Sequence, residues 1–295
     1  MRLCWLVLLA LGACASGPQH AEPGSGMFAL LGDVPYSQPH ANLLDAMIDR
    51  INREKPAFVV HVGDITGGNG PCTDEWLEAR ARQFARFDTP FVLVPGDNEW
   101  TDCHRTGFDP LERLAKVRSL FHSQAMALPG FTRQAAAYPE HVRWTAGRTV
   151  YATVNVPGSN NNLGRIPAMD REYEVRMDAV LAWLAEAVDK AGALDIEKLV
   201  IFMHADPDFA ESHNRKQPDG YARLLDAFRK HAARLKKPFV VAHGDTHRFR
   251  HDHPLEGVPN LERVEVDGWP WLGWLKVGPS AKPAEALAVE RLLNN

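Results

Sequence analysis

Short apolar runs alternate with longer amphipathic stretches through most of the chain. Helical periodicity predicts helices over residues 39–54, 74–87, 110–121, 169–191 and 219–235. The apolar runs between them, such as FVVHV, FVLV and FVVAH, have the length and composition of buried strands. This alternation is typical of an α/β protein. The sequence contains no internal repeat of fixed period.

Five of the predicted strands end in the same way, with an aspartate after the apolar run. These residues are Asp33, Asp64, Asp97, Asp206 and Asp245. His204 and His247 lie close to two of them. Strand ends of an open α/β sheet share one edge, so residues far apart in the sequence can converge there. Clustered carboxylates repel one another, and a bound cation relieves that repulsion. We therefore expect a metal site, although a single Gly-Asp is typical of an ordinary turn or helix cap.

Other metal-binding and catalytic motifs do not explain these residues. The segment HGDTH at 243–247 has zincin spacing, but glycine replaces the general-base glutamate and the segment follows a strand. The aspartates lack EF-hand spacing. No nucleophile elbow, P-loop or G-x-G-x-x-G motif follows any predicted strand. Serine hydrolase, NTPase and dinucleotide-binding classes are therefore unsupported.

Composition narrows the class further. The 295 residues are 45% hydrophobic and 24% charged, which excludes a disordered, collagen-like or coiled-coil protein. With 33 Lys and Arg against 37 Asp and Glu, the formal net charge is −4. This balance predicts no nucleic-acid patch. The spread of motifs from Asp33 to His247 favours a single large domain.

The amino terminus predicts export. Residues 3–15 form an apolar run behind Arg2 that is too short to span a bilayer, and we interpret residues 1–15 as a signal peptide. The sequence LGAC resembles a lipobox, which predicts lipidation at Cys14, with residues 16–26 as a flexible tether. The alternative is an A-x-A cleavage site at residues 13–15. Either way we expect an exported protein, periplasmic or anchored to the outer membrane.

Export also bears on the two remaining cysteines. Cys72 and Cys103 would lie in an oxidising compartment, so we expect them to form a disulfide. The bridge would close about 32 residues and contribute roughly 3 to 4 kcal/mol. Two separate buried thiols are the alternative.

The ordered motifs resemble those of the calcineurin-like metallophosphoesterases. That family's pattern is D-x-H, G-D, G-N-H-[DE], a lone His and G-H-x-H. This chain has Asp33, Gly63-Asp64, GDNE at 96–99, His204 and GDTH at 244–247. The segment GDNEWTDCHR at 96–105 looks like the signature of a divergent branch. Over residues 27–277 the resemblance implies a metallophosphatase-type four-layer α-β-β-α sandwich. It also implies hydrolysis of phosphoesters at a dinuclear site holding Mn, Fe, Mg or Zn.

The resemblance further implies a ligand set. It assigns Asp33 and His247 to the first metal and makes Asp64 the bridging carboxylate, with Asp97, His204 and Asp245 on the second metal. Pro35 replaces the His of D-x-H, so water, Tyr36 or substrate would have to fill that position. Asp97 and Asp245 stand where the family has neutral ligands, which favours harder ions over an all-nitrogen zinc site.

The expected catalytic and substrate-binding positions depart from the family as well. Asn98 stands where the family has its catalytic His, and an amide can stabilise an oxyanion but cannot act as an acid. Glu99, His104 or His243 would then protonate the leaving group. A register shifted by one would instead place Asn98 on the metal and Glu99 at the His position. The predicted substrate contacts are Arg105 and the loop 158–162, with Asn160 and Asn161.

The leading hypothesis is thus an exported phosphoesterase in which a metal-held hydroxide attacks phosphorus. Its substrate would be a small-molecule or lipid phosphoester, with membrane contact only through the N-terminal lipid anchor. One alternative is a degenerate fold that binds metal or phosphate without turnover. Weaker alternatives are a non-phosphate metallohydrolase and a structural envelope lipoprotein. Residues 278–295 are expected to form a C-terminal tail with a short helix ending at Leu293.

Overall fold

The computed structural model describes residues 26–209, 216–282 and 285–294. The predicted signal peptide and the lipidation site Cys14 lie outside the described residues, as does the predicted tether except for Gly26. Five strands form one sheet: β1 (Phe28–Leu31), β2 (Val59–His61), β3 (Phe91–Leu93), β11 (Leu272–Pro279) and β12 (Leu287–Asn294). Seven form a second: β4 (Thr132–Ala135), β5 (Tyr138–Ala146), β6 (Thr149–Thr153), β7 (Lys198–Phe202), β8 (Phe239–His243), β9 (Arg250–Asp252) and β10 (Leu261–Glu265). The helices are α1 (Gln38–Glu54), α2 (Asp74–Phe84), α3 (Pro110–Phe121), α4 (Gly158–Asn161), α5 (Pro167–Ala191) and α6 (Ala222–Leu235), with a 3-10 helix, η1 (Thr101–Thr106).

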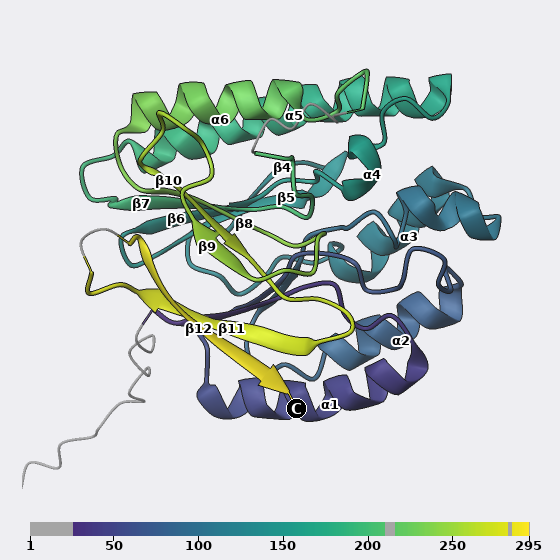
Figure 1. The fold of residues 1–295 in the computed structure, drawn as a ribbon. Coiled ribbons are helices and arrows are strands. Elements are labelled where there is room, and N and C mark those ends of the chain that lie inside the picture. Colours follow the sequence, from purple (N-terminus) through teal and green to yellow (C-terminus); the bar gives the residue numbers. More distant parts are fainter. Residues whose placement is uncertain (1–25, 210–215, 283–284, 295) are drawn as a thin grey trace, which may run out of the picture.

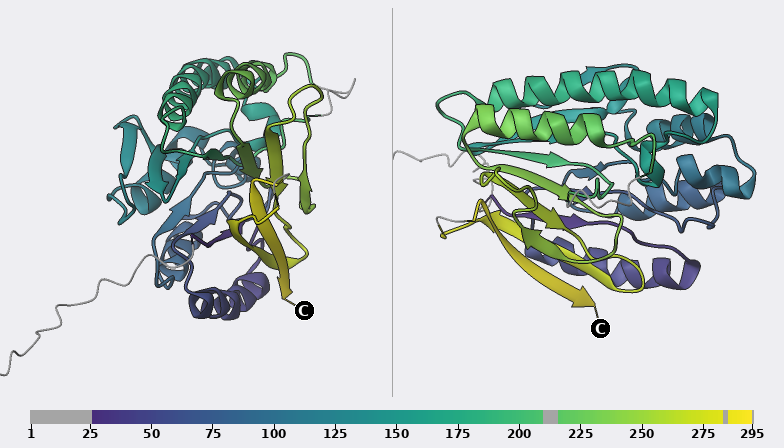
Figure 2. Two further views of the ribbon diagram at one scale, coloured as in Figure 1. Left: turned by 90° about the vertical axis from the view of Figure 1, so that its left-hand side faces the viewer. Right: turned by 45° about the horizontal axis from the view of Figure 1, so that its top comes forward.

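The two sheets face each other and carry helices on their outer sides (Figures 1 and 2). The strand orders are β12-β11-β1-β2-β3 and β4-β5-β6-β7-β8-β10-β9. β1, β2 and β3 are parallel, as are β6, β7, β8 and β10. Helices α5 and α6 cover the larger sheet and α1 and α2 cover the smaller one. The predicted α/β class and four-layer α-β-β-α sandwich are therefore confirmed.

Three apolar layers hold this arrangement together. Along β1, Phe28 and Leu30 face the layer between the sheets, whereas Ala29 and Leu31 face α1. A strand that is buried on both faces must be apolar at every position, which explains its continuous apolar run. The middle layer is rich in aromatic rings, and Phe28 packs edge-on against Tyr151 and Phe202 of the opposite sheet. Each buried side chain of this size contributes roughly 1.5 to 3 kcal/mol.

Capping residues set several helix boundaries. Asp109 accepts hydrogen bonds from the N–H groups of Leu111 and Glu112, and α3 has the predicted bounds. α2 ends at Phe84, three residues before its predicted end, since Phe87 N–H bonds back to the Phe84 carbonyl in a tight turn. α6 begins at residue 222 instead of 219, because the Asp219 side chain accepts from the N–H of Tyr221 in a turn.

The predicted C-terminal helix is wrong, because this segment is a strand. β12 pairs antiparallel with β11 along eight residues, from Leu272 opposite Asn294 to Pro279 opposite Leu287. Without β12, β11 would present a row of unpaired backbone groups at the edge of the smaller sheet. Pairing along that edge outweighs local helix propensity. Arg291 of this strand also forms an ion pair with Asp267 at 2.6 Å.

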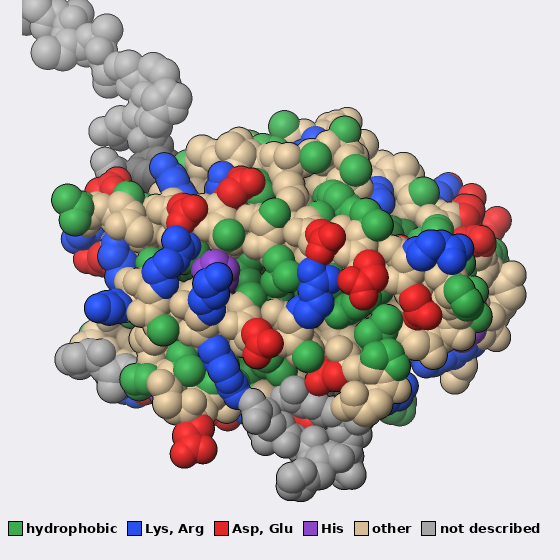
Figure 3. Space-filling view, turned by 90° about the horizontal axis from the view of Figure 1, so that it is seen from above, with side chains coloured by type: hydrophobic (Ala, Val, Ile, Leu, Met, Phe, Trp, Pro, Cys, Tyr) green, Lys and Arg blue, Asp and Glu red, His purple; other side chains and the backbone are tan. Residues whose placement is uncertain are grey.

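The outer face of α5 and α6 mixes charges of both signs (Figure 3). Arg223 pairs with Asp178 at 2.5 Å and with Glu174 at 3.0 Å across the two helices. Exposed pairs of this kind are each worth less than about 1 kcal/mol. Among the described residues, no helix combines the length and the apolar character that crossing a bilayer requires.

Candidate metal centre

The loops that follow β1, β2, β3, β7 and β8 meet at one end of the two sheets. Within the smaller sheet, Asp33 N–H donates to the Gly63 carbonyl at 2.9 Å. Between the sheets, His204 Nδ1 lies 2.7 Å from the Val62 carbonyl oxygen. The Asp245 N–H also donates to Asp33 Oδ1 at 3.1 Å. The structure therefore places residues from distant parts of the sequence beside one another.

Two groups of potential ligand atoms form at this meeting point. They are Asp33, Asp64 and His204, and Asp97, His204 and Asp245, with the atoms of each group within 4.8 Å of one another. His204 belongs to both groups. Its Nε2 lies 3.3 Å from Asp64 Oδ1 and 3.0 Å from Asp97 Oδ1. The remaining strand-end aspartate, Asp206, lies outside both groups and pairs with Arg250 at 2.8 Å.

Pro35 occupies the position of the expected histidine, and the next residue, Tyr36, lies at the candidate site. Its hydroxyl donates to Asp64 Oδ2 at 3.0 Å and lies 2.8 Å from His247 Nε2. It is also 3.5 Å from Asp33 Oδ1. His247 Nε2 itself is 3.6 Å from Asp33 Oδ1. The phenol oxygen therefore sits among all three side chains that the sequence assigns to the first metal.

The backbone at the site adopts unusual conformations. Asp33, Asp64, Asp245 and His247 have φ values of 56°, 61°, 82° and 61°. Such left-handed conformations are uncommon outside glycine and cluster at functional sites. Close backbone approach also requires glycine at Gly158, where a Cβ atom would lie 2.6 Å from Asp97 Oδ1. The strained backbone conformations of these residues are thus concentrated at the candidate site.

Burial of these carboxylates makes the centre electrostatically demanding. Burial raises the pKa of Asp33 and of Asp64 well above the usual range, and it raises the pKa of Asp245 to about 6. Burial opposes the charged form of His204, but the surrounding carboxylates raise its pKa well above 6.5. Burial also opposes ionisation of Asp97, but hydrogen bonding and attraction to His204 lower its pKa to about 2. Buried carboxylates and imidazoles within ligand distance fit divalent cations, which would offset the excess negative charge.

Comparison with known proteins identifies the family. The family model for calcineurin-like phosphoesterase matches residues 27–249, which include every candidate ligand. This chain belongs to the calcineurin-like phosphoesterases. Curated proteins give no match.

Solved structures share the calcineurin-like phosphoesterase fold. A dimetal phosphatase from Danio rerio is 13% identical with a TM-score of 0.58, and the match covers 90% of this chain and 96% of that one. A purple acid phosphatase from yellow lupin (Lupinus luteus) seeds is 12% identical with a TM-score of 0.54, covering 92% of this chain and 52% of that one. The phosphopantetheinyl hydrolase of Mycobacterium tuberculosis is 13% identical with a TM-score of 0.51, covering 91% and 97%. At these identities the similarity concerns the fold alone.

Within the calcineurin-like pattern, the geometry favours the unshifted register. Asp97 joins His204 and Asp245, whereas the Asn98 amide group donates to Asp64 Oδ2 at 2.6 Å and to the Thr66 carbonyl at 2.9 Å. Asn98 thus presents donors to Asp64, and a metal ligand must present an acceptor. Glu99 is completely buried and accepts from the Gly96 N–H at 2.6 Å, so its side chain supports the loop.

Several predicted residues lie outside the ligand groups. His104 is exposed and contacts Arg165. His243 is completely buried, and burial lowers its pKa to about 4. Asn161 is also completely buried, with its amide donating to the Gly220 carbonyl at 2.9 Å. The structure thus engages the Asn161 side chain with the protein itself, and a substrate contact through it stays a prediction.

Asn160 and Arg105 occupy different environments near the site. The Asn160 amide donates to the carbonyl groups of Leu163 and Pro218 at 2.9 and 3.1 Å, which orders the loop. Arg105 is exposed and pairs with Asp102 at 2.7 Å. Arg105 therefore remains accessible to a ligand, whereas the Asn160 side chain is engaged with the protein.

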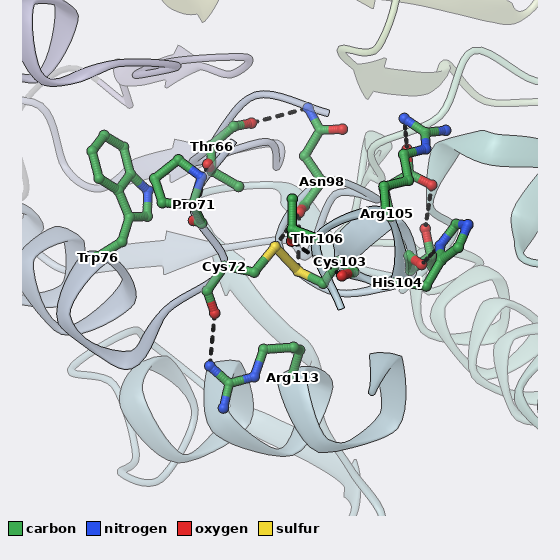
Figure 4. Close-up of a disulfide and its surroundings, with 12 residues drawn as sticks. Thr66, Pro71, Cys72, Trp76, Asn98, Cys103, His104, Arg105, Thr106 and Arg113 are labelled. Carbon is green, nitrogen blue, oxygen red and sulfur yellow. Dashed lines mark hydrogen bonds and ion pairs between the residues drawn. A yellow bond between two sulfur atoms is a disulfide. The ribbon is translucent and has the colours of Figure 1, made fainter. Parts of the chain in front are cut away.

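The predicted bridge between Cys72 and Cys103 is present in the structure and underlies Asn98 (Figure 4). The two Cα atoms are 5.7 Å apart, and the sulfur atoms lie 3.4 and 3.3 Å from the Asn98 carbonyl oxygen. The Cys72 carbonyl accepts from Arg113 at 2.8 Å. The disulfide therefore joins η1 to the loop before α2, directly beneath a candidate catalytic residue.

Sequence reasoning missed Asp102 and Arg165, and it included Ser159 only as a member of the loop 158–162. The Ser159 hydroxyl lies 2.8 Å from Asp97 Oδ2 and 2.9 Å from Asp102 Oδ1. Burial and the nearby Asp97 raise the pKa of Asp102 to about 7. Arg165 donates to the Thr101 carbonyl at 2.5 Å. The Asn-rich loop drew attention to this region, but no sequence signal distinguished Ser159 from its neighbours.

Proposed function

We propose that this calcineurin-like phosphoesterase hydrolyses phosphoesters with two divalent metal ions. The observation that carries the proposal is the presence of two adjacent groups of potential ligand atoms, which meet at His204. Asp33, Asp64 and His247 would hold one ion, with Asp64 bridging to the second. Asp97, His204 and Asp245 would complete the other position. The abundance of carboxylates favours Mn²⁺, Mg²⁺ or Fe over Zn²⁺.

Divalent ions at such a site act as Lewis acids and lower the pKa of water toward neutrality. The protein's own side chains position the reactants. Asn98 holds Asp64 through two hydrogen bonds, one from its side chain at 2.6 Å and one from its backbone at 3.0 Å. Its other side-chain N–H donates to the Thr66 carbonyl at 2.9 Å, and it would have to leave that acceptor in order to donate to a developing negative charge on the leaving oxygen. Because an amide does not release a proton, we expect the enzyme to prefer esters of acidic alcohols, such as aryl phosphates.

The proposed location is the cell envelope, outside the reducing cytoplasm. The apolar run of residues 3–15 and the LGAC sequence motivate it. The bridge between Cys72 and Cys103 supports an oxidising compartment. Radiolabelled palmitate should label the full-length chain in bacterial cells but not a Cys14→Ser variant. A secreted protein that carries no label would favour the A-x-A cleavage site instead.

The test of the proposed activity uses the chain from residue 16 onward. We would quantify bound metal and measure hydrolysis of aryl phosphate monoesters and diesters with added Mn²⁺. Asp64→Ala should lose metal and activity together. Asp252→Ala is the control, because Asp252 on β9 pairs with Arg263 on β10 and belongs to neither ligand group.

The outcomes separate the competing functions. Metal binding with no hydrolysis of either ester would support the degenerate binding protein that Pro35 and Asn98 suggest. Absence of both metal binding and hydrolysis would refute the proposal. Hydrolysis that survives Asp64→Ala would show that the chemistry takes place elsewhere.

A further inference from the structure

A pocket of about 370 Å³ lies beside the candidate metal centre. It runs along η1 and the loop that connects α4 to α5. Its polar and charged lining includes Asp102, His104, Arg105, Ser159, Arg165 and Lys216. The volume is within the range of sites that bind small molecules.

Two observations place the pocket beside the candidate metal centre. Ser159 lines the pocket, and its hydroxyl lies 2.8 Å from Asp97 Oδ2. On the other side, Gly68 lies between the pocket residue Arg105 and Asn98. A Cβ atom at Gly68 would lie 3.0 Å from Arg105 Nη1 and 3.0 Å from Asn98 Oδ1. The pocket therefore begins at the side of the site where Asn98 faces the leaving group in the proposed function. A group attached to the leaving oxygen would extend into it.

Among the described residues, Arg165 is one of three cations that line the pocket, together with Arg105 and Lys216. Its guanidinium donates to the Thr101 carbonyl at 2.5 Å and to Asn162 Oδ1 at 2.8 Å, and it also contacts His104 Nδ1. In the described part of the chain, no carboxylate forms an ion pair with it. The nearby carboxylates already have partners, because Asp102 pairs with Arg105 at 2.7 Å and Glu172 with Arg176 at 2.6 Å.

The environment of Arg165 favours an anionic ligand. The side chain is half-buried, and burial lowers the pKa of its guanidinium. A partly desolvated charge without a counterion is costly, and an incoming anion would offset that cost. The planar guanidinium group also suits two parallel hydrogen bonds to a phosphate or carboxylate. Arg105 and Lys216 place two further positive charges around the same pocket.

We propose that this pocket binds a second anionic group on the alcohol portion of the substrate. The substrate class is then a phosphoester whose leaving group carries a further phosphate or carboxylate. This inference rests on the proposed function, since the first phosphate must lie at the metal ligands. Arg165 acts as a specificity residue that contacts the distal anion, and it takes no part in the bond cleavage itself.

The test compares matched substrates with the Mn²⁺-loaded chain from residue 16 onward. Phenyl phosphate lacks a second anion and 4-carboxyphenyl phosphate carries one on the same ring. The wild type should show kcat/KM at least about tenfold higher for the carboxylated ester. Arg165→Gln should remove that preference while changing kcat/KM for phenyl phosphate less than about twofold. Arg165→Lys should retain part of the preference because it keeps the charge.

A binding measurement separates this inference from the activity. Isothermal titration with benzylphosphonate and 4-carboxybenzylphosphonate, which cannot be hydrolysed at a P–O ester bond, needs no turnover. If the protein hydrolyses neither ester but binds the carboxylated phosphonate more tightly in an Arg165-dependent way, the pocket assignment stands and the proposed function fails.

The contrary results are equally clear. Equal kcat/KM for both esters, or a preference unchanged in Arg165→Gln, would overturn the pocket assignment while leaving the phosphoesterase activity intact. Arg223→Gln is the control, because Arg223 pairs with acidic residues of α5 on the outer face. Thermal unfolding of each variant checks that the fold is retained.

Discussion

Replacing Asp245 by asparagine should make the metal-free protein more stable against unfolding than the wild type. When metal is present, the variant should be the less stable of the two. Asp245 Oδ1 lies 4.0 Å from His204 Nε2, and its Oδ2 accepts from the Asp206 N–H at 3.0 Å. Asparagine has the same shape and can keep that acceptor. It removes one negative charge from a centre where buried Asp33, Asp64 and Asp97 already repel one another.

The magnitude follows from the pKa of Asp245. Burial raises that pKa from 3.8 to about 6, and each pKa unit corresponds to about 1.4 kcal/mol. Because the folded protein holds this proton more tightly, its stability falls as the pH rises from about 4 to about 6. The full penalty, at most roughly 3 kcal/mol, is present at pH 7. With 28% of the side chain exposed, solvent screening reduces it, so we expect a gain of roughly 5 °C in Tm for Asp245→Asn.

The assay is thermal unfolding at pH 7 with a chelator and with Mn²⁺. Wild type should gain about 2.7 kcal/mol when free metal reaches one hundred times its Kd, and the variant should gain less. The order of the two Tm values should therefore reverse when metal is added. At pH 4 the difference between the two apoproteins should shrink. Glu140→Gln is the control, since buried Glu140 pairs with Arg118 at 2.6 Å and its loss should lower Tm equally in both conditions.

One result would refute this reasoning directly. If Asp245→Asn is less stable than wild type in chelator at pH 7, the carboxylate contributes structural hydrogen bonds that outweigh its electrostatic cost. Equal stabilisation of both proteins by Mn²⁺ would show that Asp245 is not a ligand.

Three further predictions concern neighbouring residues. Asn98→His should raise kcat/KM for alkyl phosphates more than for aryl phosphates, because it restores a proton donor; an unchanged ratio between the two esters would contradict this. Gly158→Ala should weaken Mn²⁺ binding by at least about tenfold, since its Cβ would lie 2.6 Å from Asp97 Oδ1. Gly278→Ala, where nothing lies within 4 Å, is the control, and equal affinities in a metal titration would contradict the prediction. Replacing Cys72 and Cys103 by serine should cost roughly 3 to 4 kcal/mol in urea unfolding and make stability insensitive to reductant; a smaller loss than that of a surface substitution would contradict it.

The sequence predicted the fold class because its main signal is local. Apolar runs such as FVVHV and helical periodicity depend on neighbouring residues, so the α/β class and most helices could be identified. β12 could not, because its stability comes from pairing with β11 and not from its own sequence. The predicted end of α2 was three residues too late for a related reason. Phe87 lies beyond the helix and packs against Phe91 of β3, a contact that the local sequence does not encode.

The same distinction applies to the candidate site. Asp33, Asp64 and Asp97 follow strands directly, and strand direction alone brings them to one edge. Tyr36 and Arg165 depend on how turns fold back across that edge, which no periodicity encodes. Asn161 was singled out by its residue type, which does not show that its amide donates to the Gly220 carbonyl in the folded chain.

The candidate ligands come from both sheets, with Asp33, Asp64 and Asp97 after strands of the smaller sheet and His204 and Asp245 after strands of the larger one. Metal ions would therefore act as a clasp between the two halves of the sandwich. Metal affinity and the packing of the aromatic middle layer are then thermodynamically linked. A substitution deep in that layer, at a distance from every ligand, would loosen metal binding by letting the halves shift. Conversely, bound metal would protect the interior from opening.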